Sequence, residues 1–329
     1  MASNVKEHTR AKVSVIIPVY GVEQYIERCA ISLFEQTLDD IEYIFVNDCT
    51  RDRSIEVLTS VIERYPNRKS QVKIIEMPQN SGQAAVRKRG LEIASGEYII
   101  HCDSDDWIDL TMYEKMYKTA VDQNCDIVIC DFNIVTQQGQ YHKTQVIPSD
   151  RIMLLRSLLN ERTHGSLCNK LIRANLYHQI DHYPQDNLLE DLTYSIQLIA
   201  KSGKHCHINE ALYNYYQHPA SLTNNKSFET SINRGLQAYS NTQLIFEFLR
   251  DNDLYELLTT EVRHLQYATK YQLRHICLTP DGQAKWNETY PEINTIKIIN
   301  TNFSATTKLI YLITSFGLYP LVWKIKKLF

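Results

Sequence analysis

The sequence Tyr98-Ile99-Ile100-His101-Cys102-Asp103-Ser104-Asp105-Asp106 runs from an apolar, β-rich segment straight into three carboxylates. Its apolar part predicts a buried strand. Carboxylates this close repel one another unless a cation lies among them, and hard oxygen ligands suit Mg²⁺ or Mn²⁺. The same acids could instead open the helix predicted from Leu110, although Asp109 could cap that helix by itself.

Strand-like and helix-like segments alternate on both sides of this stretch. Apolar, β-rich runs predict strands at residues 13–19, 43–46, 72–75, 98–102 and 126–130. Apolar residues at helical spacing predict helices at 22–34, 55–62, 84–94 and 111–123. Because strands separated by such helices form βαβ crossovers, we predict the α/β class, with a mainly parallel, Rossmann-like sheet and helices on both faces. Beyond residue 135 the alternation stops, and residues 228–279 predict a mostly helical C-terminal region.

Polar residues follow three of the predicted strands at the point where each strand ends. Tyr20 follows the first strand, Asp48 the second, and the acid cluster Asp103–Asp106 the fourth. Ligands of open parallel sheets bind outside the carboxyl ends of the strands. We therefore expect these three groups, distant in the chain, to share one rim.

Common phosphate-binding motifs are absent from the sequence. No GxGxxG follows the first strand, which disfavours a dinucleotide site, and no GxxxxGK[ST] occurs, which excludes P-loop chemistry. A phosphatase with an aspartyl nucleophile would need an acid pair after the first strand, where this chain has Pro18-Val19-Tyr20. A nucleotide would have to be held in another way.

The composition excludes further classes of protein. The 329 residues are 43% hydrophobic and 22% charged with a net charge of −3, which is typical of a globular protein and gives no general attraction to nucleic acid. The eight cysteines form no CxxC pair, so we predict neither a zinc site nor a disulfide framework, and expect reduced core thiols in a cytoplasmic protein. Met1–Lys12 lacks the apolar core of a signal peptide.

The C-terminal segment has its own charge pattern. The charged residues after Glu292 are five lysines, and an uncharged run, Leu309–Trp323, lies among them. As a helix this run would span roughly 22 Å, short of the ~30 Å hydrocarbon core, so we do not expect it to cross a bilayer. We interpret residues 306–329 either as a segment on an anionic membrane surface or as a helix packed on its own domain or on a partner subunit.

Several motifs resemble those of the family 2 glycosyltransferases, which have the GT-A fold. Order and spacing agree over residues 13–131, and the resemblance extends to about residue 225, where it is closest to the bacterial polysaccharide-synthesising branch. The matching motifs are Val13–Tyr20, Val46–Asp52, Asn80–Gly82 with Arg87 and Gly90, Gly96–Ile99, Asp103–Asp106, Asn169–Leu171, Leu189–Asp191 and Leu212–Tyr215. The chain departs from the common Asp-Asp-Gly-Ser-Thr pattern at Asn47, Cys49 and Arg51.

The resemblance implies that a nucleotide-sugar binds at the rim. The residues that would bind it are Pro18, Tyr20, Asp48, Gly82, Arg87, Asp103 and Ser104. In the family, a carboxylate at the position of Asp48 accepts the uracil N–H, an aromatic ring packs on the base, and the acid at Asp103 binds the ribose. From the residues alone, Asp48 could equally form an Asx turn, and Arg87 could be a solvated charge on its helix.

The resemblance also implies a divalent cofactor, Mn²⁺ or Mg²⁺, with Asp105 as its ligand. His218 lies in a segment similar to the one that closes over the diphosphate in the family. Its imidazole could bind the metal or donate to the leaving phosphate.

Other imidazole and aromatic side chains have simpler interpretations. His205 and His207 look like a zinc pair, but no second pair follows at a useful spacing, so we interpret both as structural. We expect His101, in an apolar strand, to be a core or rim residue. Tyr213, Tyr215 and Tyr216 could stack on sugars or simply pack.

Glycosyl transfer to a hydroxyl requires a base, and Glu190-Asp191 is the candidate. The pair precedes apolar residues at helical spacing, so it should lie in the first turn of a helix, where the dipole keeps a carboxylate ionised. The resemblance implies that Asp191 is the catalytic base and Glu190 its supporting neighbour. Capping of the helix is the alternative interpretation of the pair.

We therefore predict three regions: a nucleotide-sugar-binding GT-A half at 1–135, an acceptor-side half with the base at 136–225, and a helical C-terminal region at 226–329. The predicted activity is inverting transfer from a UDP-sugar to a glycan or lipid-linked acceptor in surface polysaccharide synthesis. A non-catalytic glycan-binding relative and a nucleotidyltransferase of similar architecture are the alternatives. We expect a cytoplasmic protein, peripheral on the cytoplasmic face of the membrane, or a homo-oligomer formed through its C-terminal region.

Overall fold

The structure is a computed structural model that describes residues 10–218, 228–294 and 296–326. It forms two compact units, and the chain passes between them several times. The first unit comprises Met1–Leu154, Ser166–Ile180 and Leu198–His218; the second comprises Leu155–Gly165, Asp181–Gln197 and Pro219–Phe329. The predicted regions, with boundaries at 135 and 225, are continuous in the sequence, whereas each unit combines three separate segments. The two boundaries remain predictions.

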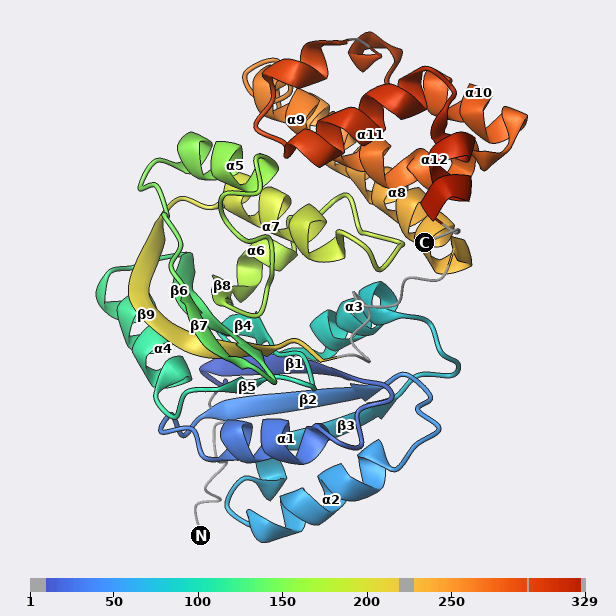
Figure 1. Cartoon of the computed structure of the whole chain (residues 1–329). Coiled ribbons are helices and arrows are strands. Elements are labelled where there is room, and N and C mark those ends of the chain that lie inside the picture. The colour runs from blue at the N-terminus through green and yellow to red at the C-terminus, as the bar shows by residue number, and fades with distance from the viewer. Residues whose placement is uncertain (1–9, 219–227, 295, 327–329) are drawn as a thin grey trace, which may run out of the picture. The chain divides into compact units, whose positions relative to one another are not determined.

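The first unit is built on one nine-stranded sheet (Figure 1). Its strands are β1 Val13–Val19, β2 Ile41–Asn47, β3 Val72–Glu76, β4 Tyr98–His101, β5 Trp107–Ile108, β6 Ile127–Thr136, β7 Gly139–Lys143, β8 Lys170–Arg173 and β9 His205–Tyr216. The order is β3-β2-β1-β4-β8-β6-β9-β5, and β7 pairs with β6. The first four strands of this order are parallel, which confirms the Rossmann-like half. Strand β8 then runs antiparallel to both β4 and β6, so the second half of the sheet is mixed.

Helices cover both faces of the parallel half. They are α1 Ile26–Phe34, α2 Ser54–Arg64 and α3 Gln83–Ile93, whereas α4 Met112–Asp122 packs against β6 and β9. Figure 1 shows α1 and α2 on one side of β1, β2 and β3, and α3 on the other. The alternation of the strands dictates this arrangement: Val15 and Ile17 belong to the core that includes α1, whereas Ile44 packs with Val86 of α3. Gly90 lets α3 approach closely, because a Cβ there would lie 2.4 Å from Ile16 Cγ2.

The remaining elements confirm a mostly helical C-terminal region. The helices of that region are α8 Phe228–Asp251, α9 Thr259–Leu273, α10 Pro280–Glu288, α11 Ala305–Ser315 and α12 Tyr319–Lys326. Three further helices, α5 Arg151–Leu159, α6 Ala174–Tyr177 and α7 Glu190–Lys201, lie earlier in the chain, between β7 and β9. Short 3-10 helices lie at Lys69–Gln71, Arg274–Leu278, Pro291–Ile293 and Ile296–Asn300. In the second unit Trp286, Tyr311 and Tyr319 form a core of their own. Within the described residues, no helix has the length and apolar character needed to span a bilayer.

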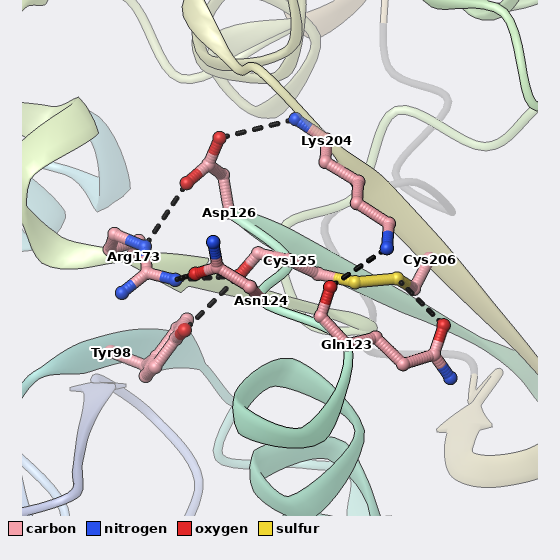
Figure 2. The surroundings of a disulfide bond; sticks show 8 residues. All are labelled: Tyr98, Gln123, Asn124, Cys125, Asp126, Arg173, Lys204 and Cys206. Atoms are coloured by element: carbon pink, nitrogen blue, oxygen red, sulfur yellow. Dashed lines mark hydrogen bonds and ion pairs between the residues drawn. A yellow bond between two sulfur atoms is a disulfide. The ribbon is translucent and has the colours of Figure 1, made fainter.

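One pair of cysteines differs from the expectation of reduced thiols. Cys125 and Cys206 form a disulfide with a Cα–Cα distance of 6.2 Å, within the usual range for such a bond. They meet because β6 and β9 run parallel from neighbouring starting points. Figure 2 shows how side chains tie the same corner together: Asp126 accepts a hydrogen bond from Arg173 Nε at 3.1 Å, and Lys204 donates to the Gln123 carbonyl. Spacing along the sequence could not reveal this pairing, since 81 positions separate the two cysteines.

Reduction of this disulfide is expected to lower the free energy of unfolding. A cross-link over 81 positions restricts the unfolded chain, and the loop-entropy argument gives at most about 4.5 kcal/mol. Urea unfolding with and without a reductant measures the effect. In the double variant Cys125→Ser, Cys206→Ser the reductant should no longer shift the midpoint. Equal stability of the wild-type protein in both conditions would contradict the prediction.

Candidate active site

Asp48 fixes a loop at the rim of the sheet. Its buried carboxylate accepts hydrogen bonds from the backbone N–H groups of Ser81, at 2.7 Å, and Gly82, at 2.8 Å. Gly82 has φ +82°, a value that favours glycine, and α3 begins at the next residue. The local turn is instead closed by Asn47, whose Oδ1 accepts from the N–H of Thr50, three residues on, at 2.9 Å. Asp48 therefore positions the N-terminus of α3.

Cys49, which stands where the family pattern has glycine, adopts a conformation that favours glycine. Its φ is +55°, in the left-handed region, and its thiol donates to the Met77 carbonyl at 3.0 Å. A non-glycine residue in this conformation costs roughly 1–2 kcal/mol. The turn after β2 is thus retained at a modest cost in stability.

The end of β1 presents an aromatic ring to solvent. Tyr20 is 51% exposed, and Pro18, two positions earlier, is half-buried in the strand. The next residue, Gly21, has φ +67°, and its N–H donates to Thr50 Oγ1 at 2.9 Å. The loops after β1 and β2 are therefore joined beside an exposed ring of the kind that packs on a planar group.

Arg87 is not the solvated charge that its neighbours in sequence suggested. Its side chain is fully buried, and Nη2 lies 2.8 Å from Asp103 Oδ1. Gln83, which the sequence pattern did not single out, donates to the same oxygen at 3.2 Å from the preceding turn of α3.

Burial, with Arg87 nearby, lowers the pKa of His101 well below its usual value, so His101 is a neutral core residue.

The acid loop does not cap the following helix. Asp103–Asp106 forms a turn between β4 and β5, closed by the Asp106 N–H donating to the Asp103 carbonyl at 3.1 Å. Helix α4 begins only at Met112, and Asp109 is the acid that accepts from Thr111 N, at 2.9 Å. Capping therefore does not explain the cluster.

Asp105 contacts a histidine from the other end of the first unit. His218 Nε2 lies 3.0 Å from Asp105 Oδ2, and His218 Nδ1 lies 3.1 Å from the hydroxyl of Tyr25. The imidazole is only 5% exposed. Burial and the neighbouring Asp103 raise the pKa of Asp105. A positive charge at this position would relieve that repulsion.

These side chains fit a divalent cation that arrives with a phosphate ligand. Across the described ranges, no group of three or more His, Cys, Asp or Glu side chains is placed to hold a metal ion by itself. Asp105 and His218 offer one oxygen and one nitrogen. Mg²⁺ is usually bound by one or two carboxylates together with substrate phosphates and water. Ser104, beside them in the loop, is buried.

The contacts of Asp106 give it a structural role in the acid loop. Its fully buried carboxylate accepts from the Tyr213 hydroxyl and, at 2.7 Å, from Tyr216 N. Burial and the two neighbouring acids raise its pKa well above the usual value. Tyr213 is buried as well, so it packs and anchors the acid loop to β9 and offers no face to a sugar.

Arg28 is the main residue of this region that the sequence pattern missed. Its guanidinium lies 3.7 Å from the centre of the Trp107 ring and 4.6 Å from that of Tyr216. Its Nη2 donates to the Asp105 carbonyl at 2.9 Å. One cation on α1 thus holds the acid loop, β5 and the end of β9. The sequence feature that could have indicated this role is the position of Arg28 next to the apolar face of α1, one turn after Tyr25.

Replacement of Arg28 by Met is expected to lower the free energy of unfolding by about 2–4 kcal/mol, since it removes a desolvated cation–π contact and a charged hydrogen bond. Urea unfolding measures the loss. Arg28→Lys should restore little of it, because an ammonium lacks the planar group that lies against both rings. Arg64→Met, which removes an exposed pair with Glu27, is the control and should cost under about 1 kcal/mol. Equal effects at positions 28 and 64 would refute the role.

Comparison with known proteins identifies the chain. The family model for "Glycosyl transferase family 2" matches residues 14–181. EpsH of Bacillus subtilis, a protein named as a glycosyltransferase, is 31% identical over 260 residues, covering 74% of this chain and 71% of EpsH. The chain belongs to glycosyl transferase family 2. Two other relatives are matched over 62% and 63% of their own length, so the chain spans less than two thirds of them.

Solved structures show that this family 2 glycosyltransferase has the GT-A fold. S. aureus TarS in complex with UDP-GlcNAc aligns with a TM-score of 0.62 at 18% identity, covering 96% of this chain and 91% of that one. The mannosyltransferase PcManGT from Pyrobaculum calidifontis, in complex with GDP-Man and Mn²⁺, aligns with a TM-score of 0.57 at 14% identity, covering 96% and 87%.

The predicted base of this glycosyltransferase lies in the second unit. Glu190 and Asp191 are the first two residues of α7; Glu190 is buried and Asp191 half-buried. Asn241 of α8 donates to the carbonyls of Asp186, at 2.7 Å, and Leu188, at 2.8 Å. Helix α8 therefore fixes the segment that leads into the acidic pair, a support that the sequence pattern did not predict.

The two histidines that looked like a zinc pair have separate partners in the glycosyltransferase. His207 Nε2 lies 3.0 Å from Asp131 Oδ1, and His205 Nε2 lies 2.7 Å from the Pro148 carbonyl. Each ring is thus held by a different loop or strand. These contacts support the structural interpretation of both histidines.

Proposed function

We propose that this family 2 glycosyltransferase transfers a sugar from a UDP-sugar to an acceptor hydroxyl with inversion at the anomeric carbon. The observation that carries the proposal is the pair of contacts that join the acid loop to distant parts of the first unit. Arg87 contacts Asp103 at 2.8 Å, and His218 contacts Asp105 at 3.0 Å. Carboxylates and cations interleaved in this way suit the binding of a diphosphate together with a divalent ion.

The donor would lie along the rim of the parallel strands. Tyr20 offers an exposed ring for the base, with Pro18 beside it. Asp48 already accepts two backbone N–H groups, but each carboxylate oxygen has a second lone pair with which it can accept the uracil N–H. Gly82 donates its N–H to Asp48, and Ser104 lies between Asp103 and Asp105 in the acid loop; both are proposed to contact the nucleotide-sugar. TarS, which was solved with UDP and with UDP-GlcNAc, supports this choice of donor.

Mn²⁺ or Mg²⁺ is the proposed cofactor, with Asp105 and His218 as the protein ligands. When bound, such an ion neutralises charge on a departing diphosphate. Arg28 keeps the Asp105 backbone in place, and Arg87 orients Asp103 toward the ribose. The Mn²⁺ complex of PcManGT supports a divalent ion.

In the proposed reaction, Asp191 removes the proton from the acceptor hydroxyl as that oxygen attacks the anomeric carbon. The bond from this carbon to the diphosphate oxygen breaks in the same displacement, and the nucleoside diphosphate leaves with the bonding electrons. An α-linked donor gives a β-glycoside. Glu190, next to the base, supports its orientation.

The acceptor is proposed to be a growing glycan or a lipid-linked saccharide in surface polysaccharide synthesis, on the cytoplasmic face of the membrane. A cytoplasmic location is supported by the burial of five of the six free cysteines. The Cys125–Cys206 disulfide weighs against it, because disulfides are rare in the cytosol. Alkylation of free thiols in freshly lysed cells decides whether that bond exists where the protein works.

A panel of nucleotide-sugars tests the proposed activity. Thermal stabilisation and slow hydrolysis are measured for UDP-, GDP- and dTDP-sugars, with and without Mn²⁺. We expect a UDP-sugar to give the largest Mn²⁺-dependent shift and to release UDP. Release of pyrophosphate would instead identify a nucleotidyltransferase, and failure of every nucleotide to bind would indicate a non-catalytic relative.

A further inference from the structure

Helices α11 and α12 and the turn between them expose four large apolar side chains. Leu309 is 58% exposed, Phe316 76%, Leu318 47% and Leu321 56%. Leu309 belongs to α11, and Phe316, the residue that caps its C-terminus, follows seven positions later and so lies on the same side of the helix. We call these four residues the apolar ridge. Side chains of this kind normally face the core, and these four do not.

The turn between the two helices has a defined backbone geometry. Gly317 has φ +71°, and its N–H donates to the Thr314 carbonyl at 2.9 Å. The next N–H, of Leu318, donates to the Ile313 carbonyl at 3.0 Å. This pair of bonds is a Schellman motif, which ends α11 in a defined geometry. Phe316 and Leu318 are therefore fixed on either side of the glycine.

The opposite side of the two helices already holds them to the second unit. Tyr311 is buried, and its hydroxyl donates to the Ile293 carbonyl at 3.1 Å. Tyr319 is buried too, and its hydroxyl lies 3.0 Å from His275 Nδ1. Packing of α11 and α12 thus uses Tyr311 and Tyr319 and leaves the apolar ridge outside the core.

The charged residues of the segment that carries the apolar ridge have one sign. After Glu292 the sequence contains five lysines and no acid. Lys308 immediately precedes Leu309, and Lys324, which is exposed, follows the last ridge residue by three positions. Apolar side chains at the level of the acyl chains, with lysines at the level of the head groups, are the arrangement by which a helix lies on an anionic membrane.

We propose that the apolar ridge rests on the surface of an anionic lipid bilayer and inserts without spanning it. A second copy of the chain is a poorer occupant. Four partly exposed side chains present on the order of 400 Å², about half of what each partner buries in a specific interface. A symmetric contact would also bring lysines against lysines. This inference goes beyond the proposed transfer reaction and does not depend on it.

Co-sedimentation with vesicles tests the inference. The full chain is mixed with vesicles of phosphatidylcholine, with or without phosphatidylglycerol, in the absence of any nucleotide-sugar. We expect the protein to sediment only with the anionic vesicles and to be released by salt. The triple variant Phe316→Ser, Leu318→Ser, Leu321→Ser should lose at least tenfold in apparent affinity. Lys324→Gln should lose about fivefold.

A matched control distinguishes vesicle binding through the apolar ridge from nonspecific binding through any exposed apolar side chain. Val121→Ser, Val146→Ser, Leu257→Ser removes three exposed apolar side chains elsewhere, which are 50%, 79% and 51% exposed, and should sediment as the wild type does. Unchanged thermal melting of both triple variants checks their folding. Vesicle binding that is absent in the wild type, or unchanged in the ridge variant, would overturn the proposal. A dimer that the ridge variant dissociates would overturn it in favour of self-association.

Discussion

Replacement of Asp191 by Asn is expected to reduce sugar transfer by about 10²–10⁴-fold, which is the contribution of a positioned general base. The amide has the same shape, and it cannot accept the acceptor proton. Its position at the start of α7 should keep the fold intact. Initial rates of transfer at saturating donor measure the loss.

Two measurements test whether the loss of transfer is specific to the proposed base. UDP binding, followed by calorimetry, should be unchanged in Asp191→Asn, because the proposed nucleotide contacts lie in the first unit. Asp181→Asn removes an exposed carboxylate from the same stretch of the second unit and should transfer at the wild-type rate. Transfer retained within threefold in Asp191→Asn would refute its role as the base.

Replacement of Asp105 by Asn should lower transfer by about 10²–10³-fold, similar to the loss of one electrostatic contact to a developing charge. The variant loses the charge that would bind the divalent ion, while its side chain can still hydrogen-bond His218. Isothermal titration of Mn²⁺ in the presence of UDP is the direct readout. We expect the Mn²⁺-dependent part of UDP affinity to disappear.

Asp122→Asn is the matched control for this experiment, because it removes an exposed carboxylate from α4 of the same unit. It should leave Mn²⁺ binding and transfer unchanged. If Asp105→Asn binds Mn²⁺ and UDP as tightly as the wild type, the metal role belongs elsewhere. A loss of transfer without a change in Mn²⁺ affinity would likewise show that Asp105 is not the metal ligand.

The parallel half of the fold was predictable from the sequence because its signals are local. Each strand from β1 to β3 is an apolar run followed by a helix whose apolar residues recur at helical spacing, and β4 is an apolar run that leads into the acid loop. The rule that ligands lie at the carboxyl ends then directs attention to Asp48 and the acid loop. Strands β8 and β9 pair across long sequence distances, and no local pattern specifies such partners.

The candidate site was predictable in part for the same reason. Asp103, Asp105 and Asp48 follow strands, so their position was evident. The burial of Arg87 and the place of Arg28 between two rings depend on tertiary packing. From the sequence alone, a charged residue on a helix is expected to be exposed to solvent, because the residues that cover it are not known. The disulfide between Cys125 and Cys206 was missed on similar grounds.

That disulfide makes part of the chain a covalent ring. Residues 125–206 form the ring, and they include Glu190 and Asp191, whereas Asp105 and His218 lie outside it. A single proteolytic cut anywhere inside the ring would leave both fragments joined until a reductant is added. The segment with the predicted base is therefore tethered at both ends to the strands β6 and β9. Oxidised protein should withstand a nick there that, after reduction, would release the polypeptide in two pieces.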